Sequence, residues 1–259
     1  MSKSNRNREQ ARARIAQQRA AQTRRRRRNR WLGGTAAAVI AAGAAVGITL
    51  AVTGGGTPAS AGGPPPSQLT ALSSLGRLQA APAPGPTGPE GVPVPGVTPL
   101  ASTATIATGR SVDGISCQTS EQTLFHIHAH LTVFVNGSPR QVPAGIGVPG
   151  AHAQQTAQGP FVTTGNCFYW LHTHAGDGII HIESPVHRTY TLGEFFDEWG
   201  QPLGPGQVGP ARGPVTAIYN GKVYQGNPRN IPLTAHAQIQ LEVSRPLIAP
   251  VSITWPSGL

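Results

Sequence analysis

An alternating run between residues 125 and 135 constrains the fold of this chain more than any other feature. Apolar residues occupy the odd positions, and the first three even positions are His126, His128 and His130. Side chains of a strand point alternately to its two faces, so this period of two predicts a strand with one apolar face and three imidazoles on the other. Asn136-Gly137 follows and predicts a tight turn.

A second histidine-rich stretch, residues 167–183, predicts a hairpin with its turn at residues 175–178. A four-residue turn pairs His172 with His181, and a two-residue turn pairs His174 with His181. Directly paired residues share a face of the sheet. Either register therefore places four polar residues on one side of the hairpin, namely His172, His174, His181 and Glu183.

The histidines are too clustered to be explained by chance. All nine lie beyond residue 125, and random placement in the last 149 residues gives about 0.5 H-x-H pairs, whereas the chain has three. An H-x-H pair holds two imidazoles on one strand face while a neighbouring strand supplies a third. We predict a zinc or copper centre whose ligands come from seven residues: His126, His128, His130, His172, His174, His181 and Glu183. His152, His187 and His236 are expected to be structural.

Other functions of these residues stay open at this point. The same site could serve a metal-dependent hydrolase or lyase, or Glu183 or Asp177 could work with one histidine in metal-free acid–base catalysis. A third possibility is a scaffold or adhesion module of the cell envelope, which needs neither a metal ion nor catalytic residues. The chain has no G-x-S-x-G motif for a serine nucleophile. Its single methionine, Met1, rules out a thioether site for Cu(I).

The run Phe125-His126-Ile127-His128, with a further histidine on a neighbouring strand, resembles the zinc site of the α-class carbonic anhydrases. That resemblance implies a zinc ion held by three imidazoles. This domain is shorter than that family's, and His130 departs from its pattern. The position of Glu183 does not match the H-x-H motif of cupins, so we assign no family.

Cys117 and Cys167 are the only cysteines. This count excludes a CxxC zinc knuckle, an iron–sulfur cluster and a thioredoxin-type motif. We predict a disulfide between them, because an even count in an oxidising compartment favours pairing. Ligation of the metal by one or both thiolates, or two free cysteines, would be the alternatives.

The remaining signals define the fold class of residues 111–259. Residues 191–194 match a capping box and predict a short helix that ends before Gly200. A second hairpin is predicted at residues 215–224, and a last strand at residues 236–243. We expect an α+β domain with a mainly antiparallel β-sheet and one short helix.

The N-terminal part predicts where this domain lies. Residues 1–30 hold twelve basic residues against one acid, and the 23 residues of 31–53 have neither charge nor proline. This pattern predicts a transmembrane helix with a basic cytoplasmic tail and places the C-terminal domain outside the cell membrane. A cleaved signal peptide, cut near Ala59-Ser60-Ala61, is the alternative. The tail is expected to contact anionic lipid headgroups and no nucleic acid, since no aromatic residue interleaves its arginines.

Residues 54–110 contain eleven prolines and only three charged residues, Arg77, Glu90 and the last residue of the segment, Arg110. Such a composition cannot build a core of its own. We expect a disordered linker rich in Pro, Gly and Ala that tethers the domain to the membrane.

Overall fold

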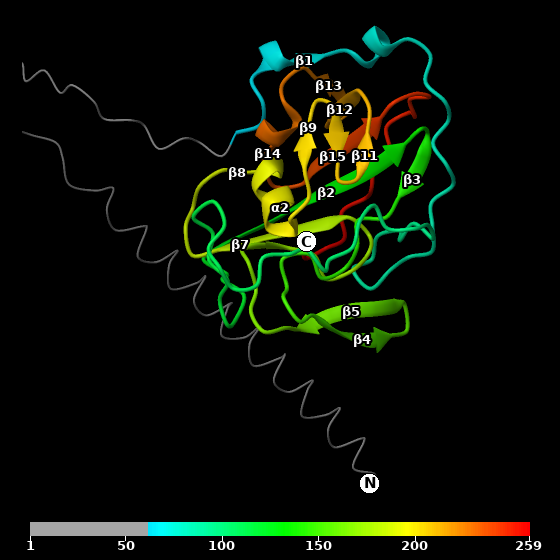
Figure 1. Cartoon of the computed structure of the whole chain (residues 1–259). Coiled ribbons are helices and arrows are strands. Elements are labelled where there is room, and N and C mark those ends of the chain that lie inside the picture. Colours follow the sequence, from blue (N-terminus) through cyan, green and yellow to red (C-terminus); the bar gives the residue numbers. More distant parts are fainter. Residues whose placement is uncertain (1–61) are drawn as a thin grey trace, which may run out of the picture. The chain divides into compact units, whose positions relative to one another are not determined.

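The computed structural model describes residues 62–259 of the chain (Figure 1). The predicted cytoplasmic tail (1–30), the predicted transmembrane helix (31–53) and the first part of the predicted linker (54–61) lie outside the described residues and stay predictions. Within residues 62–259, no helix combines the length and the apolar character needed to cross a bilayer.

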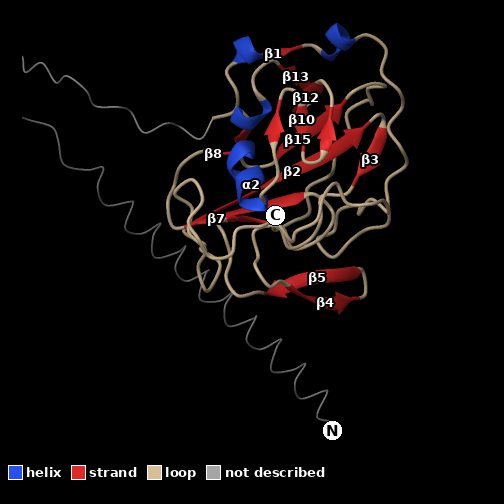
Figure 2. Ribbon diagram, in the orientation of Figure 1, coloured by secondary structure: helices blue, strands red, loops and turns tan. Residues whose placement is uncertain are grey.

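Most of the described strands form one sheet of eight strands (Figure 2), with the order β1-β13-β12-β15-β2-β7-β6 and with β3 paired to β2. All of its pairs are antiparallel except β2 with β15, which is parallel. The strands are β1 Leu69–Thr70, β2 Phe125–Val135, β3 Ser138–Arg140, β6 Leu171–His172, β7 Ile179–Ser184, β12 Val215–Tyr219, β13 Lys222–Tyr224 and β15 Ala237–Val243.

Within residues 62–259, this architecture confirms the mainly antiparallel sheet with one α-helix. The central parallel pair is a difference from the prediction, because alternation of apolar residues identifies a strand but carries no information about its direction.

The apolar face of β2 packs into the main core. This core also contains the apolar side chains of β15 and of the helix α2 (Leu192–Trp199). The helix begins at the predicted capping box, where Thr191 and Glu194 each accept a hydrogen bond from the other's backbone N–H, and it ends at Gly200 in the left-handed conformation. The buried residues of β2 and α2 in this core are Phe125, Ala129, Leu131, Val133, Leu192, Phe195, Phe196 and Trp199.

Smaller elements complete the domain. Two short sheets pair β8 (Tyr190–Thr191) with β14 (Pro232–Leu233), and β10 (Gln207–Val208) with both β9 (Leu203–Gly204) and β11 (Ala211–Arg212). A hairpin joins β4 (His152–Thr156) to β5 (Gly159–Thr164). Three 3₁₀ turns are η1 (Pro66–Gln68), η2 (Leu72–Leu75) and η3 (Pro228–Asn230).

Residues 62–110 differ from the expected linker, because they lie against the domain. Strand β1 pairs with β13, Gln79 forms a bridge with Ile248, and Pro99 forms a bridge with Gln141. Val92 is fully buried. The composition shows only that this segment cannot form a core alone, and its apolar side chains instead pack on a core that the rest of the chain supplies.

Candidate metal centre

Strand pairing brings most of the predicted ligands to one face of the sheet. In the β2–β7 ladder, His126 lies opposite Glu183 and His128 lies opposite His181. In the β6–β7 ladder, His172 lies opposite His181, which is the register of the four-residue turn. The ladders thus place four histidines and Glu183 at facing positions on adjacent strands, as the alternation predicts.

Four of these residues form a first donor set, which comprises His126, His128, His181 and Glu183. The Nε2 atom of His126 lies 3.1 Å from Nε2 of His128 and 3.0 Å from Oε1 of Glu183. The Nδ1 atom of His181 lies 3.2 Å from Nε2 of His128 and 3.4 Å from the same oxygen. The four donor atoms all lie within 4.8 Å of one another.

This spacing fits a small divalent ion. With metal–ligand bonds of about 2.0–2.1 Å, neighbouring corners of a tetrahedron are roughly 3.3 Å apart. The four contacts of the first donor set, 3.0–3.4 Å, require only small shifts to reach that geometry. The set could therefore hold one ion through three nitrogens and one oxygen.

His172 and His174 form a second pair of donors next to the first set. Their Nδ1 atoms lie 2.9 Å from the carbonyl oxygen of Tyr169 and 2.6 Å from that of Val162. Each ring therefore carries its proton on Nδ1 and has its lone pair on Nε2. The two Nε2 atoms are 3.2 Å apart. Ligating histidines commonly show this arrangement, in which one nitrogen donates to a carbonyl and the other binds the metal.

Burial keeps most of these imidazoles neutral. It lowers the pKa of His128 to about 3, with further lowering by His181 and His126. Burial also lowers the pKa of His172 and of His174, and the neighbouring histidines add to this effect. Neutral imidazoles are the form that binds a metal, so protons compete weakly for these nitrogens at neutral pH.

His181 and Glu183 are the charged members of the centre. Burial opposes a charge on His181, but hydrogen bonds to Glu183 and Glu90 outweigh it and raise the pKa of His181 to about 9. Burial also opposes the charge of Glu183, and hydrogen bonds from His126 and His181 outweigh it and hold the pKa of that carboxyl well below its ordinary value. A carboxylate ligand is thus ionised across the physiological range.

Two glutamates belong to the centre although the sequence gives no sign of it. Glu90 Oε1 lies 2.7 Å from Nε2 of His181, and Glu121 Oε1 lies 3.4 Å from Nε2 of His174. Both residues come from irregular segments, where no periodicity indicates which side chains meet. Glu90 is the sole acid among residues 54–110, but this isolation does not indicate which side chain it contacts.

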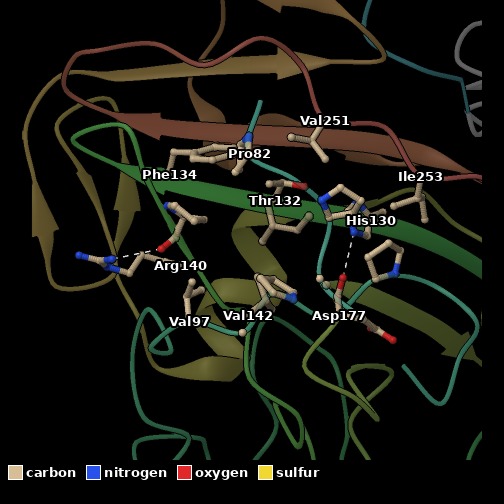
Figure 3. Close-up of a pocket in the computed structure, with 18 of the residues that line it drawn as sticks. Pro82, Val97, His130, Thr132, Phe134, Arg140, Val142, Asp177, Val251 and Ile253 are labelled. Carbon is tan, nitrogen blue, oxygen red and sulfur yellow. Dashed lines mark hydrogen bonds between the residues drawn. The ribbon is translucent and has the colours of Figure 1, made fainter. Parts of the chain in front are cut away.

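The structure does not bring His130 into either group of donors. Strand β2 pairs His130 with Ile179, so no histidine lies opposite it. Its Nε2 atom instead lies 2.9 Å from the carbonyl oxygen of Asp177, as Figure 3 shows. The ring also packs on Gly178, where an added Cβ would lie 3.1 Å from Nε2. Sharing a face with His126 and His128 is therefore not sufficient for His130 to join them.

His130 and Asp177 line an apolar cavity of about 250 Å³ between β2 and the prolines of residues 82–95 (Figure 3). Burial, followed by the neighbouring Glu90, raises the pKa of Asp177 to about 8. No residue of the first donor set lines this cavity, nor do His172 and His174.

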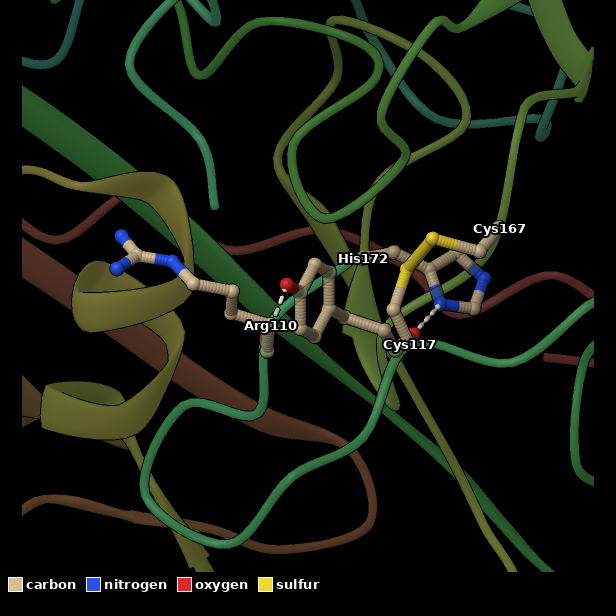
Figure 4. Close-up of a disulfide and its surroundings, with 5 residues drawn as sticks. Arg110, Cys117, Cys167 and His172 are labelled. Atoms are coloured by element: carbon tan, nitrogen blue, oxygen red, sulfur yellow. Dashed lines mark hydrogen bonds between the residues drawn. A yellow bond between two sulfur atoms is a disulfide. The ribbon is translucent and has the colours of Figure 1, made fainter. Parts of the chain in front are cut away.

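The predicted disulfide between Cys117 and Cys167 is present, with the two Cα atoms 5.4 Å apart (Figure 4). It lies on the chain segment that leads to His172 and to the Tyr169 carbonyl that orients it. Because no free cysteine is left, the centre offers only nitrogen and oxygen donors.

The remaining histidines lie outside the centre, as expected. His152 is exposed on β4. His187 packs on Phe125 with ring centroids 4.4 Å apart, and exposed His236 stacks on Trp255.

Comparisons with protein-family models, with curated proteins and with solved structures found no match to this chain.

Proposed function

We propose that this protein binds a divalent transition-metal ion, zinc or copper(II), through the first donor set. The ring of four contacts of 3.0–3.4 Å supports this proposal most strongly. Imidazole and carboxylate donors without sulfur suit both ions. The second oxygen of Glu183 is buried and has no hydrogen-bond partner among the described residues. A bound cation would offset the cost of burying that charged oxygen without a partner.

Ion binding or carriage fits the surroundings of the site better than catalysis. An enzyme needs an open metal position inside a pocket, whereas a carrier needs an ion that can exchange with solvent. The side chain of His126 is 38% exposed, so the first donor set reaches the surface. The apolar cavity of Figure 3 lies beside His130 rather than beside these donors. A metal-dependent hydrolase or lyase is therefore our second choice, and a metal-free envelope scaffold is the third.

Metal analysis of the full chain, purified in detergent without chelator, tests this proposal. We expect near-stoichiometric zinc or copper, and we expect the pair of substitutions His128→Ala and His172→Ala to abolish it. His152→Ala is the matched control, because His152 is exposed and outside the centre. Circular dichroism checks that the variants fold. The proposal fails if the unmodified chain is metal-free and takes up none of Zn, Cu, Ni or Co on titration.

On the sequence of residues 1–53 we further propose that the domain is anchored in the cell membrane and lies outside it, with the basic tail against anionic headgroups of the inner leaflet. Protease added to intact cells should release or degrade a tag at the C-terminus and leave a tag at the N-terminus intact. Loss of the C-terminal tag only after lysis would contradict this orientation.

A further inference from the structure

The centre contains more donors than one ion can use. A tetrahedral ion takes four ligands, and the first donor set already supplies four. His172 and His174 remain, both fully or almost fully buried, and Glu121 lies beside His174. His172 and His174 also form a compact group with His181, with one donor atom of each within 4.8 Å of the others.

The hydrogen bonds of His172 and His174 leave a gap that a cation fits. Both Nδ1–H groups are used by backbone carbonyls, so neither neutral ring has a hydrogen to place between the two Nε2 atoms. Two lone pairs then face each other across 3.2 Å. That separation is close to the roughly 3.3 Å between two ligands of a tetrahedral ion.

The charge of the centre also favours a second ion. Glu90, Glu121 and Glu183 all contact it, and every ion pair of these three carboxylates among the described residues is with a histidine. No lysine or arginine takes part in these pairs. If all three are ionised, one divalent ion leaves one of these negative charges without an offset, and a second ion would supply it.

We propose that the protein binds a second divalent transition-metal ion through Nε2 of His172, Nε2 of His174 and the carboxylate of Glu121, next to the first. A donor atom of His181 lies within 4.8 Å of donor atoms of His172 and His174, and His181 is also a member of the first donor set, so the two sites would be neighbours. Three protein ligands leave the fourth position of the second ion for water. The side chain of Glu121 is 38% exposed, so the second ion also borders solvent. This inference rests on the proposed metal-binding function.

Native mass spectrometry of the full chain, stripped with chelator and titrated with Zn²⁺, tests the inference. We expect two bound zinc ions in the unmodified chain, one in His174→Ala and one in His126→Ala. Because His174 is buried and its replacement could disturb folding, Glu121→Ala is the second variant. It should raise the Kd of the second ion at least about tenfold, since even outer partners of a metal ligand contribute that much. His236→Ala, at an exposed residue outside the centre, should still bind two.

The outcomes separate the two proposals. Two ions in the unmodified chain, reduced to one by either substitution, support the second site. A single ion that Glu121→Ala and His174→Ala leave unchanged overturns the second site but not the proposed function. No bound zinc, copper, nickel or cobalt at all overturns both. Loading with Cu²⁺ gives an independent readout, because a half-field electron paramagnetic resonance signal is expected only from two neighbouring copper ions.

Discussion

Strand β15 and the histidine-bearing strands bury polar side chains on the same face of the sheet, but their polar atoms have different partners. Gln238 of β15 lies beside His130, and Gln240 lies beside Thr132. Gln240 accepts a hydrogen bond from the backbone N–H of Val251 at 2.8 Å and donates to the carbonyl of Ile248 at 3.2 Å. Glu242 accepts from the N–H of Ile248 at 2.7 Å.

The histidines of the centre contact mainly one another and glutamates. Nitrogens of His126, His128 and His181 lie 3.0–3.4 Å from one another or from Glu183, and the Nε2 atoms of His172 and His174 are 3.2 Å apart. A buried polar row is therefore not by itself a sign of a binding site, since the polar side chains of β15 pair with backbone groups and, between Nε2 of Gln240 and Oε1 of Glu242, with each other at 2.9 Å. In the pair His172 and His174, two acceptor nitrogens face each other, and a cation between them would complete their bonding.

Metal removal should separate the two regions most clearly. A ligand that binds only the folded state stabilises it by about 4 kcal/mol when its free concentration is 1,000 times its Kd. We expect the free energy of unfolding of the full chain, measured with urea, to rise by about that amount when Zn²⁺ is restored after chelation. His126→Ala with Glu121→Ala should remove most of the gain. Superimposable curves with and without zinc would contradict a folded-state metal centre.

The disulfide between Cys117 and Cys167 should also stabilise the region that holds the histidines. Replacing Cys117 and Cys167 by serine opens a loop of 50 residues. The chain-entropy relation predicts a loss of about 4 kcal/mol in the free energy of unfolding. Zinc stoichiometry should be retained in the variant that still folds, because the sulfurs are not ligands. Loss of zinc from a folded variant would show that the bridge is needed to position His172.

A substitution on β15 should weaken folding without touching the metal. Gln240→Leu leaves the N–H of Val251 and the carbonyl of Ile248 without their partner, which costs about 1–3 kcal/mol. The unfolding free energy should fall by that amount, and the number of bound zinc ions should stay the same. If zinc is lost in the folded variant, the two regions are not independent and the comparison fails.

The smallest expected effect is the number of protons that the protein releases when it binds zinc. At pH 7, His181 holds a proton because its pKa is raised to about 9, whereas His128, His172 and His174 hold none because their pKa values are lowered. Zinc at Nδ1 of His181 should therefore release about one proton, and above pH 9 release should vanish. Calorimetric titration in two buffers of different ionisation enthalpy measures this number.

Glu90→Gln sharpens that measurement. Loss of this carboxylate lowers the pKa of His181, so fewer protons should be released at pH 7. Release of two or more protons by the unmodified chain would show that the buried imidazoles are charged before zinc binds.

The parts of the fold that could be predicted from the sequence are those whose apolar and polar residues alternate with the period of a strand or a helix. The strand at residues 125–135, the hairpin that pairs His172 with His181, and the helix from Thr191 to Gly200 each carry their own local signal. The disulfide followed from the count of cysteines and the expected compartment. Strand pairing then placed most of the predicted donors together without further information.

The parts that could not be predicted depend on contacts between distant segments. Glu90 and Glu121 reach the centre from irregular chain, and no pattern around either residue indicates its neighbours. His130 shares the face of His126, but its neighbour on β7 is an isoleucine at the end of the ladder. Residues 62–110 lack a core of their own, and their packing is decided by the surface they cover.

The most direct test of a histidine- and glutamate-bound metal is X-ray absorption at the metal edge, on the full chain loaded with zinc or copper. We predict a first shell of nitrogen and oxygen at about 2.0–2.1 Å, with the multiple-scattering pattern of imidazole rings. A shell with sulfur at about 2.3 Å, a hydrated ion without imidazole, or no bound metal would contradict it.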